Sequence, residues 1–563
     1  MSAAPTSSNL AAAEPRSPTT AQRQGGPRTI PIVAAPTGGV QRAAHAVGSR
    51  AAATRGDDAP YRAYRPAAFT PAERGEVTVL LGGLHWRVER LLQGVLENMG
   101  HKVQLLPSAT QADLMAGREM ADIGQCSPTS FTTGNLANFL RAEAVRIGAA
   151  EVAKRYVYVT AGSCGACRFG QYHQSYELAL RNLGLEAFRM YLLGQDGMDQ
   201  GAAPGGGLRL TLPATLGVVW AIMLTDVVQD LEYRVRPYEK NAGDTDRAVH
   251  AAISELHELF RHRPARGGEG LGSALWHVGT GYFVDAMRRV RRHFDAIELD
   301  RLRVKPIVKI TGEFYLQTVE GEPNHHMHRW LESEGAEVYP AAITVWLDYL
   351  MRLAVQDHQD RIGIKAGSRR GAVSISLAQQ LLRFTHRRMR AALGDVPRAL
   401  PPQEELRRLA APWFHSRQNG GEGDMLVGKA LWAHLYHKAH MICELSPYSC
   451  MPNTMSIGAM AGVLGRHPDL LYAPIEIKGD AEVHALSRCQ MVLTEARKRA
   501  QREYEAVLQR IGCSEAQLRE LAQRHPELNR ATAAIPHHGV TGAAANFALH
   551  LASLHGIRVA ERA

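Results

Sequence analysis

Two cysteines stand close together in the stretch AGSCGACRFGQYHQ, residues 161–174. The β-forming run YVYVT precedes it, and SYELALRNLGLEAF, which has helical spacing, follows it. Cys164 and Cys167 are therefore predicted to lie in a strand-to-helix turn, in which Gly162 and Gly165 permit tight backbone conformations. A C-x-x-C pair in such a turn is compatible with a redox dithiol, half of a zinc site, part of an iron–sulfur cluster, or no site at all.

Two further cysteines share a second pattern, C-x-P-x5-G. It occurs in QCSPTSFTTGN, with Cys126, and again in SCMPNTMSIGA, with Cys450. Proline is favoured in the first turn of a helix, so each cysteine is predicted to end a strand and precede a helix. Such a turn places a sulfur at the carboxyl edge of a sheet, beside a helix start that favours negative charge.

The spacing of the cysteines weighs against zinc and against a simple dithiol. Zinc sites usually combine two paired elements, and here Cys443 and Cys450 are seven apart. A thioredoxin-like pair should follow the first strand of a small fold, whereas this C-x-x-C follows a whole α/β unit. An iron–sulfur cluster tolerates scattered ligands, because the fold gathers them.

The remaining cysteines have a simpler interpretation as small core residues. Cys489 and Cys513 lie in a long charged helical pattern and are predicted to be packing residues. Cys443 is left open between packing and a place near the site, at the end of a helix. The four turn cysteines Cys126, Cys164, Cys167 and Cys450 are the candidate ligands.

Composition and charge limit the class of protein. The chain has 563 residues, 45% hydrophobic and 21% charged, and its seven irregularly spaced cysteines suit a reducing, cytoplasmic compartment. Residues 1–65 hold eight arginines and three acidic residues, half of the net charge of +10. We therefore expect no nucleic-acid partner, and we expect no membrane span, because the most apolar run, residues 210–224, is short and contains proline.

The elements that must position the cysteines form two similar α/β units. Residues from 76 read as strand, helix, strand, and so do residues from 304. Both contain L-E-x-x-G-x-x-V, at residues 96–103 and 331–338, which predicts a helix that ends at a C′ glycine before the next strand.

These patterns predict an α/β protein with two lobes of parallel sheet, helical inserts and a site between the lobes. The predicted segments are a disordered basic tail (1–70), the first α/β lobe (76–239), a helical segment (240–303), the start of the second lobe (304–345), a helical insert (346–440), the rest of the second lobe (441–480) and C-terminal helices (481–563).

Five stretches together resemble the 2-hydroxyacyl-CoA dehydratase iron–sulfur family, and in particular the dehydratase-like module associated with CoA-enzyme activases. They are CGACRFGQYHQ, QCSPTSFTTGN, VRPYEKNAGDTD, ITGEFYLQ and SPYSCMPNTM, and the resemblance covers about residues 76–480. It implies two flavodoxin-like (Rossmann-like) lobes with a [4Fe–4S] cluster between them.

The resemblance also implies a chemistry and a ligand set. A separate ATP-hydrolysing activase would supply a low-potential electron for radical dehydration or reduction of an acyl-CoA, in a homo- or heterodimer. By motif match the ligands are Cys126, Cys164 or Cys167, and Cys450. The chain departs from the family in having a possible fourth thiolate, an insert at 346–440 and a basic tail, and no residue stands out as a catalytic base.

Three hypotheses follow. The chain is a dehydratase-like lyase or acyl-CoA reductase component, a non-catalytic electron-transfer or activase-associated [4Fe–4S] protein, or a zinc-stabilised binding module.

Overall fold

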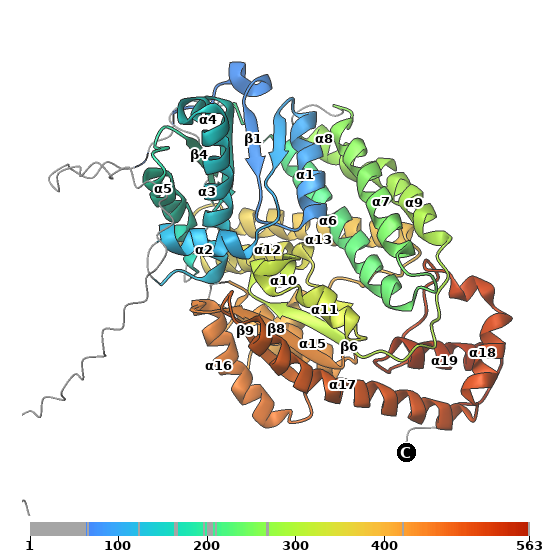
Figure 1. The fold of residues 1–563 in the computed structure, drawn as a ribbon. Coiled ribbons are helices and arrows are strands. Elements are labelled where there is room, and N and C mark those ends of the chain that lie inside the picture. The colour runs from blue at the N-terminus through green and yellow to red at the C-terminus, as the bar shows by residue number, and fades with distance from the viewer. Residues whose placement is uncertain are drawn as a thin grey trace, which may run out of the picture. The chain divides into compact units, whose positions relative to one another are not determined.

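The fold is built around two sheets whose strands follow one another in a similar order. In this computed structural model the described residues are 64, 67–121, 124–162, 167–194, 197–199, 207–208, 211–265, 270–418 and 421–560. Most of the predicted disordered tail, 1–70, lies outside them. Residues Tyr64–Ala563 form one compact unit (Figure 1).

The first sheet has the strand order β2-β1-β3-β4-β5. Its strands are β1 (Thr78–Leu81), β2 (Lys102–Leu105), β3 (Tyr156–Ala161), β4 (Arg189–Gly194) and β5 (Gly197–Asp199). The first four pair in parallel, and β5 is antiparallel to β4, which the sequence did not predict. The helices along this part of the chain are α1 (Trp86–Asn98), α2 (Gln111–Met120), α3 (Ser127–Ile147), α4 (Ala149–Arg155) and α5 (Tyr172–Asn182).

The second sheet has the order β7-β6-β8-β9, with every pairing parallel. Its strands are β6 (Ile307–Gly312), β7 (Glu337–Tyr339), β8 (Met441–Pro447) and β9 (Tyr472–Ile477). Helices α10 (Phe314–Thr318) and α11 (Met327–Ser333) join β6 to β7, and α16 (Met451–Arg466) joins β8 to β9. The predicted α/β class with two sheets of mainly parallel strands is confirmed.

The two lobes begin in the same way. Helices α1 and α11 each end two residues before a glycine of positive φ, 86° at Gly100 and 83° at Gly335. The strand that follows pairs in parallel with the preceding one, with Thr78 beside Lys102 and Ile307 beside Glu337. The L-E-x-x-G-x-x-V repeat therefore marks equivalent helix-to-strand returns, as predicted.

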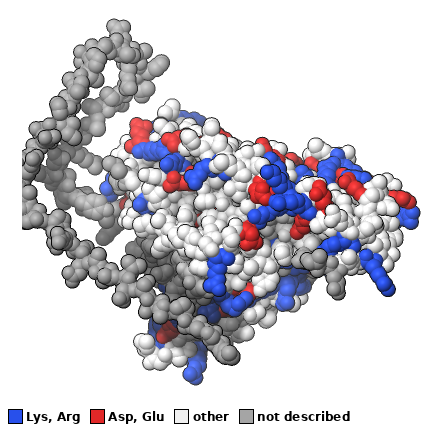
Figure 2. Space-filling view, turned by 90° about the horizontal axis from the view of Figure 1, so that it is seen from below, with Lys and Arg blue, Asp and Glu red and all other residues white. Residues whose placement is uncertain are grey.

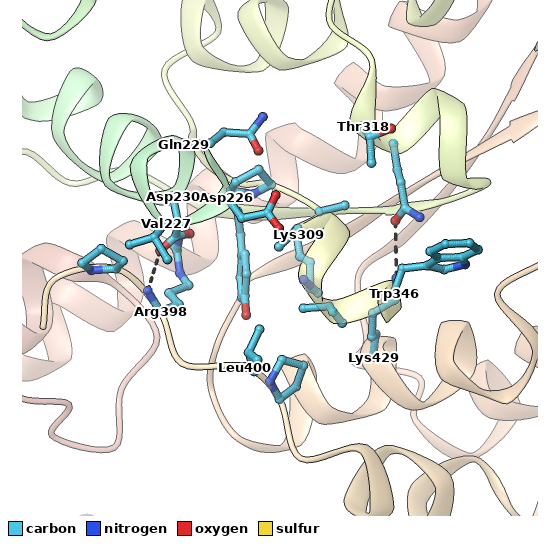
Figure 3. A pocket seen from close by; sticks show the side chains of 18 of the residues that line it. Asp226, Val227, Gln229, Asp230, Lys309, Thr318, Trp346, Arg398, Leu400 and Lys429 are labelled. Carbon is cyan, nitrogen blue, oxygen red and sulfur yellow. Dashed lines mark hydrogen bonds and ion pairs between the residues drawn. The ribbon is translucent and has the colours of Figure 1, made fainter. Parts of the chain in front are cut away.

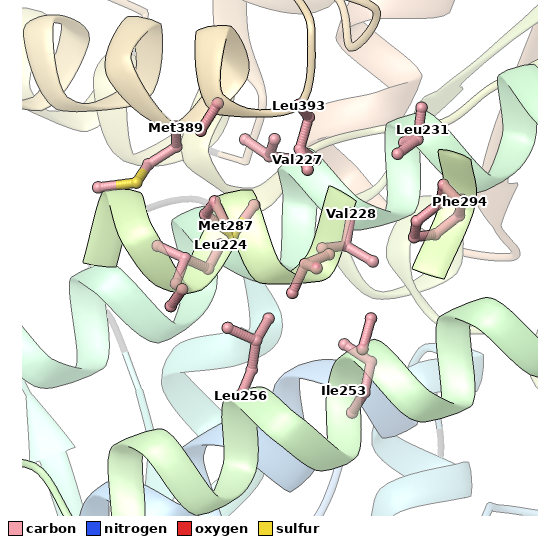
Figure 4. Packing of buried hydrophobic residues seen from close by; sticks show 14 of the residues in the cluster. Leu224, Val227, Val228, Leu231, Ile253, Leu256, Met287, Phe294, Met389 and Leu393 are labelled. Carbon is pink, nitrogen blue, oxygen red and sulfur yellow. The ribbon is translucent and has the colours of Figure 1, made fainter. Parts of the chain in front are cut away.

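A helical core separates the two lobes in sequence and holds the largest set of buried apolar side chains. It contains α6 (Leu212–Val235), α7 (Asp244–Arg261), α8 (Leu271–Gly279), α9 (Tyr282–Asp295) and, from the later insert, α13 (Ser368–Ala392). Figure 4 shows side chains of α6, among them Leu224 and Val228, between those of α7, α9 and α13. The remaining helices of the insert are α12 (Ile343–Asp360), α14 (Gln403–Ala410) and α15 (Gly423–Leu435).

Helix α6 is longer than the apolar run that marks it in the sequence. Residues Leu212–Tyr238 are long and apolar enough to cross a membrane by length and composition, which corrects the expectation that no segment reaches that length. Within the protein, 61% of its apolar window is buried, and a buried core helix passes the same test.

The C-terminal part is helical, as predicted. It comprises α17 (Glu482–Ile511), α18 (Glu515–Gln523) and α19 (Ala543–Leu554). The first half of α17 packs in the core of the second sheet, and its second half packs with α18 and α19. On the face that Figure 2 draws, basic and acidic side chains are interspersed rather than gathered by sign.

Candidate functional site

Cys126 lies at the start of α3 and is the N-cap of that helix, with Pro128 in the first turn. Its side chain is buried, and its Sγ lies 3.2 Å from Thr129 Oγ1 and 3.4 Å from the Tyr172 hydroxyl. The predicted helix start is confirmed. The predicted preceding strand is wrong, since helix α2 lies between β2 and Cys126, and residues 121, 124 and 125, described in that connection, are in no strand.

The physical reason for this difference is a strong helix start in the segment. Thr110 and Asp113 form a capping box that begins α2. Helix α2 then packs backbone to backbone on α3, where a Cβ atom added to Gly134 would lie 1.7 Å from the Asp113 carbonyl oxygen. Gly134, the glycine of the first C-x-P-x5-G motif, therefore permits a helix–helix contact.

Cys450 follows a strand and precedes a helix, as the sequence predicts. Strand β8 ends at Pro447, and Cys450 is the N-cap of α16, with Pro452 in its first turn. The buried thiol lies 3.6 Å from Asn453 Oδ1, and Asn453 in turn donates to Glu444 on β8 over 3.3 Å. The Tyr472 hydroxyl donates to the same carboxylate over 2.6 Å.

Cys167 lies in the strand-to-helix turn that the sequence predicts. Strand β3 ends at Ala161, and Cys167 is the N-cap of a short 3₁₀ helix, Arg168–Gln171, that leads into α5. The Phe169 backbone N–H donates to Cys167 Sγ over 3.4 Å. Cys164, its predicted companion, lies in residues 163–166, outside the described residues.

Glu313 is a site residue that sequence reasoning missed. It follows β6 directly and caps α10, with its carboxylate accepting from the Leu316 N–H over 3.0 Å. Loss of hydration raises the pKa of Glu313 to about 7, although backbone N–H groups of Tyr315 and Leu316 oppose the rise. The signal available was an acidic residue between the strand pattern PIVKITG and an apolar helix start, a typical N-cap position.

The electrostatic interactions join these residues into one site. Burial raises the pKa of the Cys450 thiol, and the charges of Glu313, Cys167 and Cys126 raise it further. Burial also raises the pKa of the Cys167 thiol to about 11, with added contributions from Glu313 and Cys126. Three thiols from both lobes therefore lie within one another's electric field.

Direct contacts between the lobes bring the thiols together. The Ser127 hydroxyl at the start of α3 donates to the Ile477 carbonyl oxygen at the end of β9, 3.4 Å away. Arg118 of α2 pairs with Asp480 over 3.0 Å, and Leu114 and Phe131 pack among the core residues of the second sheet. Helices α2 and α3 thus lie against the carboxyl end of β9.

A buried arginine strengthens the same junction. Arg87 on α1 is 1% exposed and pairs with Glu232 of α6 over 2.6 Å and with Glu320 of the second lobe over 2.8 Å. Buried charges need such partners, so this ion-pair network ties the first lobe, the helical core and the second lobe together.

The other cysteines lie elsewhere. Cys443 is inside strand β8 rather than at a helix end, and its Sγ lies 3.9 Å from that of Cys489 on α17, within the apolar core. Cys513 lies in the turn between α17 and α18, not on a helix, and packs among C-terminal residues.

The described residues include donor atoms that could bind a metal, but these atoms do not converge on one point. Among them, no three His, Cys, Asp or Glu side chains converge closely enough to hold a metal ion. The raised thiol pKa values mean that Cys167 and Cys450 carry protons at neutral pH, and that a bound metal would displace those protons. The soft donors and the adjoining backbone N–H groups nonetheless fit the chemistry of an iron–sulfur cluster.

A small cavity of about 40 Å³ lies where α6, α10 and the later helical insert meet. Its wall includes Phe314, the neighbour of Glu313, and Figure 3 shows Lys309 of β6 extending into it. Lys309 is 4% exposed, its Nζ lies 3.6 Å from the centre of the Tyr339 ring, and burial lowers its pKa well below the usual value. Lys429, which lines the same cavity, pairs with Glu422 over 3.1 Å.

A comparison with known protein families and with curated proteins finds no matching family model and no matching protein.

Proposed function

We propose that the protein binds an iron–sulfur cluster of the [4Fe–4S] type through Cys126, Cys450 and one or both of Cys164 and Cys167. The observation that carries this proposal is the placement of Cys126, Cys167 and Cys450 at three helix starts that lie close together, where the start of α3 contacts the carboxyl end of β9. Each is the N-cap of a helix.

The chain's own residues would hold the cluster and tune it. The cysteine thiolates are soft ligands that suit iron, and each lies at a helix start, which favours a negatively charged centre. At Cys167 the Phe169 N–H also donates to the sulfur. Thr129 and Tyr172 lie within hydrogen-bonding distance of Cys126 Sγ and would orient that ligand. When bound, such a cluster supplies one-electron chemistry at low potential.

We further propose that the cluster serves radical dehydration or reduction of an acyl-CoA. Glu313 supports this proposal, because a carboxyl with a pKa of about 7 can hold or release a proton at neutral pH beside the thiols. Loss of water from a hydroxyacyl thioester requires such a proton transfer. Glu313 is thus our candidate for the acid–base group.

An electron donor would have to reach the cluster from outside the chain. We propose a separate ATP-hydrolysing activase in this role. Tyr448, Met451 and Met455, beside Cys450, are 54%, 46% and 39% exposed. Exposed methionine and aromatic side chains are typical of protein-docking surfaces, and this surface would place a partner near the thiols.

The decisive experiment is anaerobic purification followed by iron and acid-labile sulfide analysis. We expect about four iron and four sulfide per chain, or per dimer if two chains share a cluster, with a one-electron couple and a paramagnetic reduced state. Cys126→Ser and Cys450→Ser should each lose or convert the cluster. Cys489→Ser, in the apolar core, is the matched control and should not.

Two results would contradict the proposal. Zinc without acid-labile sulfide would favour a zinc-stabilised binding module. A clean Cys164–Cys167 disulfide in active, iron-free protein would instead indicate a dithiol redox pair.

A further inference from the structure

A second cavity, of about 510 Å³, lies at the amino end of the second sheet. It is lined by Ile307 and Glu337, the first residues of β6 and β7, and by Lys438, which precedes β8. Glu313 and Cys450 follow the opposite, carboxyl ends of β6 and β8. The cavity is therefore distinct from the candidate cluster site.

Positive charge dominates the lining of this cavity. It presents five arginine and lysine side chains, Arg234, Arg301, Arg390, Arg398 and Lys438, besides His437 and His537, and two acidic ones, Glu337 and Asp395. The acidic residues already have partners. Arg398 pairs with Glu337 and with Asp230, the latter over 2.6 Å, and Arg390 pairs with Asp395 over 3.0 Å.

Three cations are left without a carboxylate. In the described part of the chain, Arg234, Arg301 and Lys438 take part in no ion pair. Burial and, to a smaller extent, repulsion from Arg234 lower the pKa of Arg301 to about 10. Burial and the positive charges of Arg234 and Arg398 likewise lower the pKa of Lys438. The cavity thus concentrates like charges at an energetic cost that an anion would relieve.

Hydrogen bonds hold two of these cations in place. Arg301 donates to the carbonyl oxygens of Leu528, Arg530 and Ala533 over 2.7, 2.7 and 2.8 Å. Arg234 donates to the Val396 carbonyl oxygen. Because neutral acceptors fix these guanidinium groups without cancelling their charge, the positive field of the cavity is preorganised.

The volume of the cavity and the uncharged part of its lining favour an organic ligand. A volume of about 510 Å³ falls in the range of small-molecule sites and exceeds what a single phosphate needs. Trp432, Ile535 and Pro536 supply aromatic and apolar surface to the same cavity. A ligand that matches both parts has phosphate groups at one end and a flat, weakly polar ring at the other.

We propose that this cavity binds a phosphorylated nucleoside, the chemistry that ATP and coenzyme A share. The phosphates contact Arg234, Arg301 and Lys438, and the base lies against the Trp432 side of the wall. A ligand here acts from the end of the second sheet opposite the cysteines, so it would serve as a regulator or anchor rather than at the reacting centre.

Calorimetric titration of the full-length protein tests this proposal with four probes: ATP, coenzyme A, adenosine and inorganic tripolyphosphate. We expect ATP or coenzyme A to bind at least tenfold more tightly than adenosine, which lacks the phosphates, and than tripolyphosphate, which lacks the ring. The tighter of the two identifies which phosphorylated nucleoside the cavity takes. Lys438→Gln should weaken that binding roughly tenfold or more, as expected for a lost charged contact.

Lys365→Gln is the matched control, since Lys365 is an exposed lysine outside the cavity lining, and it should leave binding unchanged. Arg234→Gln provides a second test if Lys438→Gln folds poorly. Failure of all four probes to bind overturns the proposal, as does binding that neither cavity variant weakens. Tripolyphosphate binding as tight as that of ATP overturns the nucleoside part. Binding that persists in Cys126→Ser shows that this site stands apart from the proposed cluster.

Discussion

The two C-x-P turns start from similar sequences and have different surroundings. Cys126 lies between two helices, beside the hydroxyl groups of Thr129 and Tyr172. Cys450 lies between a strand and a helix, beside Asn453 and, through it, the buried carboxylate of Glu444. One turn thus has neutral neighbours and the other an ionisable one.

The glycines of the two motifs differ in the same way. Gly134 and Gly458 occupy equivalent places in α3 and α16, but only Gly134 contacts another backbone, that of α2. A Cβ atom added to Gly458 would meet nothing within 4 Å. The position of the first turn therefore depends on the packing of α3 against α2, whereas the position of the second depends on strand β8.

The largest expected effect comes from adding a side chain where α2 and α3 are in backbone contact, at Gly134. Gly134→Ala would place a Cβ atom 1.7 Å from the Asp113 carbonyl oxygen, so α2 and α3 must move apart. We expect a loss of about 3 kcal/mol or more in the free energy of unfolding, measured by denaturant titration.

Gly458→Ala is the matched control, because it adds a methyl group to an exposed helix interior. It should be neutral or stabilise the protein by about 0.5–1 kcal/mol. Equal destabilisation by the two substitutions would show that the turns are held in the same way.

A smaller effect, dependent on pH, should appear only at the second turn. Burial raises the pKa of Glu444 to about 7, against about 4.3 in an unfolded chain. Between these values the unfolded chain loses the proton and the folded protein keeps it, so stability falls as pH rises. Relative to Glu444→Gln, the wild type should lose about 2–3 kcal/mol between pH 4.5 and 7.5 in parallel denaturant titrations.

The sign of that dependence is the sharper part of the prediction. If the difference between wild type and Glu444→Gln stays constant over this pH range, burial does not raise the pKa of Glu444, and pH does not distinguish the second turn from the first.

The smallest effect concerns the neutral neighbours of Cys126. Tyr172→Phe removes one hydroxyl contact with the Cys126 sulfur and leaves that of Thr129. We expect a loss of about 1 kcal/mol that does not change between pH 4.5 and 7.5. A pH-dependent loss in the same titrations would show that an ionisable group also acts at the first turn.

Local signals in the sequence predicted much of this arrangement. The glycine returns at Gly100 and Gly335, the helix starts at Pro128 and Pro452, and the turn that holds Cys167 all follow from residue types within a few positions. Backbone sterics and capping set such features, so a short stretch is enough to predict them.

Most of the features that sequence reasoning missed depend on residues far apart in the chain. Helix α2 begins at a local signal that was overlooked, the Thr110–Asp113 capping box, but its packing on α3 joins Asp113 and Gly134 across some twenty residues. The basic cavity joins Arg234, Arg301 and Lys438 through the fold alone, and the low hydration of Glu313 arises from packing around it. No local pattern encodes these long-range contacts.

Helix α6 has a consequence for the way in which the chain is made. It ends at Val235, whereas α13, which covers part of it, begins only at Ser368. At ordinary rates of translation the ribosome needs on the order of ten seconds to synthesise the intervening chain. During that interval a helix apolar enough to cross a membrane is only partly covered. Nascent-chain chaperones, or early packing of α7 and α9, would therefore have to protect it from aggregation and from the membrane-insertion machinery.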